Sequence, residues 1–557
     1  MKKKIISLLL VLLLVITGLT GCGGNEEPTS NTNGENSGNA DSGSGSSKGD
    51  VKKIIYALNG EPQTLDPTMN VYARGSLVLL NMFSGLYKID PDNSVVPALA
   101  EGYTLDDTGT VYTFKLREGL KWSDGSPLTA EDFVYSWKKI LNPDTASQAA
   151  YYLYYIKNAQ GYNMGEKTVD DVAIKALDDR TLEVTLENPT AYFTALTATT
   201  AYSPVKKDVV EKEGWTLQAE TLVSSGPFMA KEIRPKEKLV LVKNPNYVDA
   251  DKVKLDEIEM VYIESPEAEL AAYENGDIDI SDNISNEAMK KYVDSDEFYS
   301  MDKIGTNYYT VNCTIKPFDD PRVRKALGYS IDREAIINNI VQGTYKPAYG
   351  FIPYGIPYAP EEGKEFRDVV GNLFTEDVAE AKKLLADAGF PDGNGFPTVK
   401  LITFNSQAEK DVAQAMQGMW QQNLGINVEI ETYESKVYWD ELNAGNYNVG
   451  FNSWTGDYPD PMTLFESELA NQNPPPASGW FTEDGAIKFN ELVEATKSEK
   501  DNVKRYENFV EAEKVLMDGM SQIPLYFYND EYLVKPYITG VGKNFTGQTI
   551  FEYADVK

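Results

Sequence analysis

The segment of the sequence with the clearest chemical potential surrounds Asp457. An apolar run at residues 447–451 leads through Asn-Ser-Trp-Thr-Gly to Asp457, and Tyr458 and two prolines follow. A carboxylate on a glycine turn between aromatic side chains is a good receptor for a protonated amine, since both the charge and the ring faces attract a cation. The same pattern suits an Asx turn, in which the aspartate only caps the loop. The residues alone favour the cap, with the amine receptor as the alternative.

Composition excludes catalytic and metal-binding systems that need histidine or several cysteines. The chain has no histidine and only two cysteines, Cys22 and Cys313. Ser-His-Asp and Cys-His nucleophiles, His-containing or four-cysteine zinc sites and iron–sulfur centres are therefore ruled out. A G-x-S-x-G match at residues 45–49 lies in linker-like sequence without the partners of a nucleophile elbow. We expect no enzyme activity, no metal, no cofactor and an inert Cys313.

A second acidic segment, residues 277–282 (Asp-Ile-Asp-Ile-Ser-Asp), superficially resembles a calcium-binding loop. An EF-hand loop needs glycine at its sixth position and glutamate at its twelfth. This chain has Asp282 and Ala288 there. The apolar residues Ile278 and Ile280 alternate with polar ones, which is typical of a strand. We therefore predict a strand in this segment.

The first 50 residues are predicted to target and tether the chain. Residues 1–21 combine three lysines with an apolar run, 5–16, that is short for a membrane span and typical of a signal peptide. The run ends in Leu-Thr-Gly-Cys22, which resembles a bacterial lipoprotein signal, so Cys22 is the expected acylation (palmitate) site. Residues 22–50 are rich in Gly, Ser, Asn and acidic residues and predict a disordered tether. A secreted protein with a chance cysteine is the alternative.

The net charge of the chain limits the kinds of molecule that it is expected to bind. The formal charge is −33 over 557 residues. Such a chain is repelled by phosphate backbones, so we expect no nucleic-acid partner.

From residue 51 onward the hydrophobic pattern alternates between strand and helix periods. Strands are expected at 54–58, 110–116, 181–186, 239–242, 258–263 and 426–430. Helices are expected at 129–140, 332–341, 375–385, 411–424 and 503–517. Mixed alternation over some 500 residues predicts two α/β lobes.

Several stretches are similar to one known family. The longest runs from residue 97 (Pro-Ala-Leu-Ala-Glu-Gly) through 112–137, which includes Lys-Trp-Ser-Asp-Gly-Ser-Pro-Leu-Thr-Ala-Glu-Asp-Phe. Shorter matches are 61–67, 225–228, 244–247, 320–327, 388–397 and 523–528. Together they resemble the bacterial family 5 extracellular solute-binding proteins, whose best-known members serve oligopeptide ABC importers. The resemblance covers essentially all of 51–557 in the family's order.

The resemblance implies a ligand site. In oligopeptide-binding members, the aspartate of a Trp-x-x-Asp-Tyr motif pairs with the α-ammonium of the ligand, and Trp454 and Asp457 match that motif. The strand around the tryptophan would hydrogen-bond the peptide backbone, and a family tyrosine lines the site. The implied ligand-binding residues are Ser453, Trp454, Thr455, Asp457, Tyr458 and Tyr528.

The resemblance does not say how the C-terminal carboxylate of a peptide would be bound, because this chain differs from the family at the positions that bind it. Phe451 and Leu442 stand where the best-studied members carry basic residues, and the histidine contact of those members cannot exist here. A further family tyrosine aligns with Ala149, although Tyr151 and Tyr152 are close by. Preferred peptide length and C-terminal recognition are therefore open.

The resemblance also implies a fold and a domain division. The expected fold is α/β and type II periplasmic-binding-protein-like, with two lobes and a hinge near residues 309 and 529. The expected domains are domain I (51–83, 206–309 and 530–557), domain II (84–205) and domain III (310–529).

The implied function is capture of extracellular oligopeptides for import, by backbone hydrogen bonding and an α-amine salt bridge. The partners would be the permease and ATPase subunits of an ABC transporter, together with the membrane through the lipid anchor. We expect a monomer on the outer face of the membrane of a Gram-positive bacterium. The alternatives are a receptor of the same family for dipeptides, a nickel chelate or an oligosaccharide, and a signalling receptor for peptide pheromones.

Overall fold

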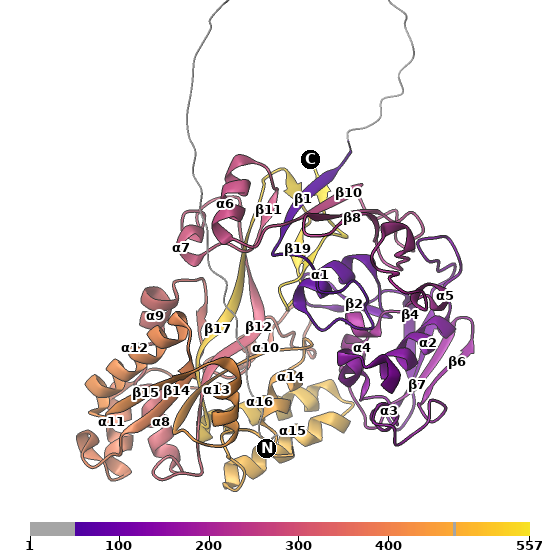
Figure 1. The fold of residues 1–557 in the computed structure, drawn as a ribbon. Coiled ribbons are helices and arrows are strands. Elements are labelled where there is room, and N and C mark those ends of the chain that lie inside the picture. Colours follow the sequence, from indigo (N-terminus) through magenta and orange to yellow (C-terminus); the bar gives the residue numbers. More distant parts are fainter. Residues whose placement is uncertain (1–50, 472–474) are drawn as a thin grey trace, which may run out of the picture. The chain divides into compact units, whose positions relative to one another are not determined.

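Two long neighbouring strands, β12 (Phe298–Val311) and β17 (Gln522–Val534), form the centre of the fold (Figure 1). The computed structural model describes residues 51–471 and 475–557. The predicted signal peptide, the predicted tether and Cys22 lie outside these described residues. Within the described ranges, no helix is both long and apolar enough to cross a lipid bilayer.

The strands β12 and β17 belong to a mixed sheet of eleven strands in the described part of the chain. In sheet order its strands are β15 (Val428–Tyr433), β14 (Val399–Phe404), β16 (Val449–Thr455), β12, β17, β11 (Ile280–Ser281), β1 (Lys53–Leu58), β10 (Glu257–Tyr262), β9 (Lys238–Lys243) and β8 (Phe228–Arg234), and β13 (Lys346–Pro347) pairs with β17 off this path. The order brings residues far apart in sequence together. For example, β1 pairs in parallel with β10, about 200 residues later.

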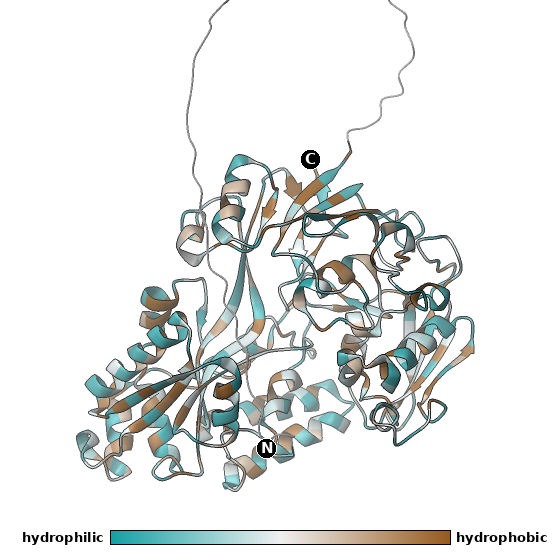
Figure 2. Ribbon diagram, viewed as in Figure 1, coloured by the Kyte–Doolittle hydropathy of each residue, from teal (hydrophilic) through white to brown (hydrophobic). Residues whose placement is uncertain are grey.

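One end of the sheet is covered by helices from residues 321–519. They are α8 (Pro321–Tyr329), α9 (Arg333–Ile336), α10 (Phe366–Val370), α11 (Val378–Asp387), α12 (Gln407–Leu424), α13 (Ser435–Asn443), α14 (Met462–Phe465), α15 (Asp484–Ser498) and α16 (Asn502–Gly519). Here β14 runs parallel to both β15 and β16, and α12 and α13 pack on β14 and β15. Figure 2 shows apolar residues concentrated on these strands and polar residues on the outer sides of the helices.

A second, antiparallel sheet lies in the segment 100–185. Its strands in order are β4 (Ala100–Leu105), β5 (Val111–Leu116), β7 (Thr181–Thr185) and β6 (Ile174–Asp178). The amphipathic helix α2 (Ala130–Leu141) packs on β6 and β7 through its buried face, which includes Phe133 and Trp137. The Asp132 carboxylate accepts a hydrogen bond from the Thr129 backbone N–H at 2.8 Å, which starts the helix as its sequence predicts.

The remaining elements are short. The helices are α1 (Ala73–Met82), α3 (Ala159–Asn163), α4 (Phe193–Leu196), α5 (Lys207–Val210), α6 (Pro266–Asn275) and α7 (Asn286–Met289). The two-stranded pairs are β2 (Tyr87–Ile89) with β3 (Val95–Pro97), β18 (Ile538–Thr539) with β21 (Asp555–Val556), and β19 (Gly542–Lys543) with β20 (Thr549–Ile550).

The expected element types are confirmed, whereas several expected boundaries are wrong. The helix expected at 332–341 is the short α9 followed by a π-helix at 337–341. The helix expected at 375–385 begins three residues later, because the Asp377 carboxylate caps the Glu380 N–H at 2.9 Å. The strand expected at 426–430 starts at Val428, since Ile426 still donates a hydrogen bond to the Trp420 carbonyl after the turn at Gly425 (φ +71°).

The carboxylates of the acidic segment 277–282 hydrogen-bond to neighbouring parts of the fold. Only Ile280 and Ser281 form a strand, although Ile278 and Ile280 are both buried as their alternation predicts. Asp279 accepts a hydrogen bond from the Ile55 N–H at 2.6 Å, and Asp282 accepts one from the Tyr56 hydroxyl at 2.6 Å. Both carboxylates therefore serve as hydrogen-bond acceptors within the fold.

The pairing of β12 with β17 is interrupted at two places, between Asn307 and Tyr308 and, more strongly, between Asp302 and Thr306. Asp302 opposes Asn529 and Thr306 opposes Phe527, so residues 303–305 of β12 stand opposite Tyr528 alone. Such a bulge bends a strand and leaves its extra residues without regular ladder bonds. The bulge at residues 303–305 lies four to six residues before 309 and opposite Tyr528, so it is close to both positions of the expected hinge, 309 and 529.

Candidate functional site

Asp457 lies on the loop directly after β16. Gly456 precedes it at a crowded position, where an added Cβ would meet methyl carbons of Ile304 and Thr463 at 2.7 Å. The Asp457 N–H donates to the Thr463 hydroxyl at 2.8 Å. The loop is therefore held by its backbone, and the aspartate side chain is left free to project from it.

The carboxylate of Asp457 accepts no hydrogen bond and forms no ion pair with any of the described residues. Asp460, three residues later, is the aspartate that stabilises this loop. Its carboxylate accepts from the Met462 N–H at 3.0 Å and from two Arg505 nitrogens at 2.6 and 2.8 Å. The Asx-cap interpretation of Asp457 is therefore wrong for this structure, and Asp460 has the capping role.

The electrostatic surroundings of Asp457 favour a cation. Burial, and then the negative charge of Glu466, raise the pKa of Asp457 to about 6. The side chain itself is exposed to solvent in a pocket, but a confined layer of water beside protein stabilises a carboxylate less well than bulk water does. A positive charge bound here would offset both effects.

The pocket at Asp457 has a volume of about 130 Å³. Its lining comes from residues 70–90, from Tyr152 and 198–201, and from 544–552. Two other carboxylates line it, but both already have partners in the fold. Asp90 accepts from the Tyr553 hydroxyl at 2.5 Å, and Glu552 pairs with Lys88 at 2.8 Å. Asp457 is thus the one unpaired carboxylate among the described residues of this pocket.

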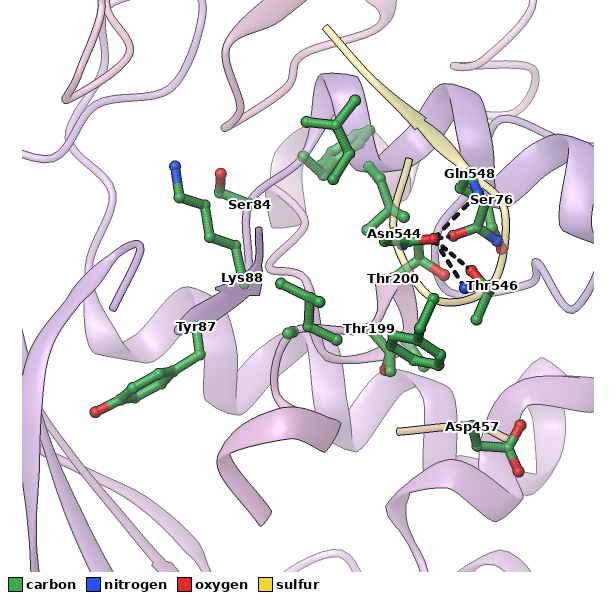
Figure 3. A pocket seen from close by; sticks show the side chains of 18 of the residues that line it. Ser76, Ser84, Tyr87, Lys88, Thr199, Thr200, Asp457, Asn544, Thr546 and Gln548 are labelled. Atoms are coloured by element: carbon green, nitrogen blue, oxygen red, sulfur yellow. Dashed lines mark hydrogen bonds between the residues drawn. The ribbon is translucent and has the colours of Figure 1, made fainter. Parts of the chain in front are cut away.

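Figure 3 shows how the polar groups of this pocket are arranged. The Asn544 side-chain oxygen accepts from the N–H groups of Thr546 and Gln548, at 3.1 and 3.0 Å. Asp457 lies apart from this hydrogen-bonded loop, at the lower right of the view. A ligand group in the pocket therefore meets a rigid loop on one side and a free carboxylate on another.

The strand before Asp457 has an edge without a strand partner. On one side, β16 pairs with β12 along its whole length, from Val449 to Thr455. On the other side it pairs with β14 at two positions only, Val449 and Gly450. Backbone groups on this side of residues 451–455 therefore have no strand partner in the described structure.

Two local hydrogen bonds involve groups of this free edge. The Tyr438 hydroxyl donates to the Phe451 carbonyl, and the Ser453 N–H donates to the Asn452 side chain at 2.9 Å. The second bond joins neighbouring residues and can be replaced by a bond to an incoming acceptor. An extended backbone could add to this edge as a further strand.

A second pocket, of about 510 Å³, lies beside the same edge. Its lining residues are Phe404, Asn405, Ser406, Glu409, Tyr433, Glu434, Ser435, Phe451, Ser453 and Tyr528. It lies where the parallel strands β14 and β15 end, which is where ligands bind in open α/β sheets. The free edge of β16 thus leads from this pocket, at Ser453, to the Asp457 pocket.

The predicted aromatic residues occupy different environments. Trp454 is 36% exposed. Tyr528 lines the larger pocket and accepts a hydrogen bond from the Asn307 side chain at 3.3 Å. Tyr458 is buried instead, and its ring stacks on Tyr192 with centroids 4.2 Å apart and an interplanar angle of 4°. The structure therefore gives Tyr458 a packing role rather than a surface for contact.

The positions that depart from the family pattern are apolar and buried. Phe451 is 4% exposed and packs edge-on against Tyr309 and Phe404, and Leu442 is 2% exposed. Ala149 is fully buried, whereas Tyr152 from the same segment lines the Asp457 pocket. No basic side chain is therefore supplied at these positions.

Sequence reasoning did not single out several residues of the two pockets. In the smaller pocket these are the loop 544–548 and residues 199–201, which come from segments without a distinctive motif. In the larger pocket they are Glu409 and Glu434. Glu409 follows Ser406 by three residues, a spacing typical of a helix capping box, so its pattern indicates a structural role.

Comparison with known proteins gives consistent matches. Residues 94–475 match the model of the bacterial extracellular solute-binding proteins, family 5 Middle. The oligopeptide-binding protein OppA of Bacillus subtilis is 34% identical over 572 residues, which cover 100% of both chains.

Two solved structures show the same α/β fold, that of type II periplasmic binding proteins. The unliganded open form of MppA, a periplasmic murein tripeptide-binding protein, has a TM-score of 0.82 at 30% identity, covering 91% of this chain and 98% of its own. Haemophilus influenzae OppA in complex with the peptide RPPGFSPFR has a TM-score of 0.65 at 28% identity, covering 91% and 99%. The structure is thus more similar to the unliganded open relative than to the peptide complex.

Proposed function

Because the chain belongs to the bacterial extracellular solute-binding proteins of family 5, we propose that it is the oligopeptide receptor of a peptide ABC importer. The family consists of solute receptors rather than enzymes, so the chemistry to be explained is binding. The receptor captures an extracellular peptide and presents it to the permease, whose ATPase subunits supply the energy of transport.

The observation that carries this proposal is the unpaired Asp457 carboxylate at the end of the free edge of β16. A peptide is the ligand class that offers both an ammonium group and a chain of backbone donors and acceptors. We propose that the backbone of Ser453–Thr455 hydrogen-bonds an extended peptide and that Asp457 pairs with its α-ammonium. Backbone pairing accepts many sequences, because it makes no demand on side chains.

The side chains around the edge complete the proposed site. The exposed indole of Trp454 offers a face for stacking, and the Tyr528 hydroxyl reaches the larger pocket beside Ser453. Tyr458 acts indirectly in this proposal. Its stack with Tyr192 and its hydrogen bond to Glu466 at 3.2 Å hold the loop that carries Asp457.

Closure of two lobes around the peptide is the proposed mechanism of capture. The proposed domains are I (51–83, 206–309 and 530–557), II (84–205) and III (310–529), and β12 and β17 connect I with III. The bulge at residues 303–305 is the natural place for these strands to bend. Closure removes water from the Asp457 pair and so strengthens it.

We also propose a location for the receptor. Acylation of Cys22 would attach a monomeric receptor to the outer face of a Gram-positive cell membrane, and residues 23–50 would give it freedom to turn. Two acyl chains give stable attachment where one would be marginal.

Native mass spectrometry of protein purified without denaturation tests the proposed function directly. We expect bound peptides, whose masses identify them after release. In a thermal scan of ligand-free protein, a pool of tri- to pentapeptides should raise the melting temperature, because a ligand that binds only the folded state stabilises it. Maltodextrins should not. A shift with maltodextrins alone would contradict the peptide assignment and favour an oligosaccharide receptor.

A further inference from the structure

The larger pocket beside Ser453 has an acidic character that amine recognition at Asp457 does not explain. Two carboxylates, Glu409 and Glu434, line it, and its described lining includes no lysine or arginine. Aromatic rings form much of the remaining wall: Phe404, Tyr433, Phe451 and Tyr528. Carboxylates among aromatic rings attract cations through both charge and ring faces.

Glu409 is not used by the fold in the way its sequence position indicates. It is the third residue of α12, and its N–H donates to the capping Ser406 hydroxyl at 3.3 Å. In a capping box the glutamate would accept a bond from the Ser406 N–H in return, but the described structure has no such bond. Its Oε2 is instead buried without a hydrogen-bond partner.

The groups around Glu409 do not neutralise it. Four tyrosines lie close enough for the charge of Glu409 to raise their pKa: Tyr309 on β12, Tyr438 on α13, and Tyr526 and Tyr528 on β17. None of them is a cation. Burial alone raises the pKa of Glu409 to about 7, so its negative charge is uncompensated.

The second carboxylate of the pocket is only partly satisfied. Glu434 Oε1 accepts from the Asn405 side-chain nitrogen at 2.8 Å. The nearby Lys400 is directed to another acid, Glu431, at 2.9 Å. The pocket therefore combines two acidic groups with no internal counter-charge.

The distance along β16 relates this pocket to the amine site. Ser453 and Asp457 are four residues apart, which is at most roughly 13 Å at about 3.3 Å per extended residue and is shorter here, because β16 ends at Thr455 and Asp457 lies on the loop. A peptide with its ammonium group at Asp457 and its backbone along the free edge therefore brings its third or fourth residue to the larger pocket.

We propose that this pocket selects a lysine or arginine side chain at the third or fourth residue of the bound peptide and disfavours a free C-terminal carboxylate there. This inference rests on the proposed function and specifies its substrate class. A volume of about 510 Å³ accommodates a long basic side chain together with bridging waters. Phe451 and Leu442, being apolar, offer nothing to a carboxylate that arrives there.

The test is a lysine scan of alanine pentapeptide amides, measured by isothermal titration. Each peptide carries lysine at position 2, 3, 4 or 5 and is compared with its counterpart carrying the uncharged norleucine. We expect the lysine peptide to bind about tenfold more tightly at position 3 or 4 and the pair to bind equally elsewhere. Tri- and tetraalanine amides should also bind more tightly than their free acids.

Two variants assign the preference to Glu409. In Glu409→Gln the ratio of the norleucine to the lysine dissociation constant should fall from about ten towards one. Glu429→Gln, at an exposed position on β15 outside the pocket lining, removes the same charge and should keep the ratio. A purely structural Glu409 would lower the melting temperature of Glu409→Gln without changing the ratio.

The outcomes separate this inference from the proposed function. Binding of the whole peptide set without a lysine preference at any position, or tighter binding of the free acids, would overturn the inference alone. Failure of every peptide to bind wild-type protein would overturn the proposed function and this inference with it.

Discussion

Replacing Asp457 with alanine is the most direct test of how the receptor holds its ligand. The carboxylate has no partner among the described residues, so the substitution removes no contact of the ligand-free fold. In the closed complex it would leave the ligand ammonium buried without a counter-charge, which costs about 3–5 kcal/mol for a fully buried pair. We expect a cost in the lower part of that range, about 3–4 kcal/mol, which is a loss of two to three orders of magnitude in affinity.

Isothermal titration across a double-mutant cycle measures the pair itself. Its four corners are wild type and Asp457→Ala, each with a free and an N-acetylated peptide. Each single change should weaken binding strongly, and the two together should cost less than their sum, because both delete the same contact. Asp457→Asn keeps the shape of the side chain and should weaken binding less than alanine does. An acetylated peptide that binds wild type as tightly as the free peptide would refute the amine pairing.

The pH dependence of binding follows from the same carboxylate. Its pKa of about 6 means that it is mostly ionised at pH 7 and mostly protonated at pH 5, while the nearby Tyr151 and Tyr152, whose pKa values are also raised, stay neutral. Peptide affinity should therefore fall about tenfold between pH 7 and pH 5. Glu466 adds to the raised pKa of Asp457 and gains protons in the same direction, since its own pKa is raised by burial. Asp457→Asn should flatten the profile, and an unchanged profile would contradict this assignment.

Three further predictions concern stability and location. Asp460→Ala should destabilise the fold by about 3–5 kcal/mol in chemical denaturation, because Arg505 (3% exposed at its side chain) would lose its buried counter-charge; a loss below 1 kcal/mol would contradict this. Ligand-free Asp457→Asn should melt no lower than wild type at pH 7. Folding raises the pKa of Asp457 to about 6, so the protonated carboxyl group stabilises the fold at low pH and this stabilisation is lost as the pH rises through about 6. At pH 7 the substitution therefore removes no stabilising charge. Cys22→Ser should move the protein from the membrane to the soluble fraction, and quantitative sedimentation of the variant with membranes would rule out the lipid anchor.

Elements with a strong local pattern could be predicted from the sequence. The strands β5 and β7 alternate apolar and polar residues with a period of two, and α2 begins at a capping box, so local chemistry determines both. Boundaries failed where a distant or backbone contact decided them. The hydrogen bond of Ile426 to the Trp420 carbonyl, for example, delays β15, although the residue itself is as apolar as a strand residue.

The kind of site could be predicted from the sequence, but the contacts that each of its residues makes with distant parts of the chain could not. The turn after β16 and its aspartate follow from the residues themselves. The residues do not reveal which aspartate caps the loop, because Asp460 is held in that role by a hydrogen bond from Arg505, 45 residues away. Tyr458 looked suited to ligand contact, but Tyr192 from a distant segment covers its ring. The free edge arises because β14 pairs with β16 only as far as Ile402 and Gly450 and then continues beside β15 alone, a property of sheet register that no local pattern records.

The place of β17 in the sheet has a consequence for how the chain acquires its structure. This strand consists of residues 522–534, and it pairs with two strands that come much earlier in the sequence, β11 on one side and β12 on the other. Until it arrives, β1 and β11 form a sheet with an unfinished edge, and β12 lacks one neighbour. Neither half of the large sheet is complete before residues 522–534 have been made, so the two halves depend on one shared strand. Deleting even the last 36 residues would leave aggregation-prone edges in both halves.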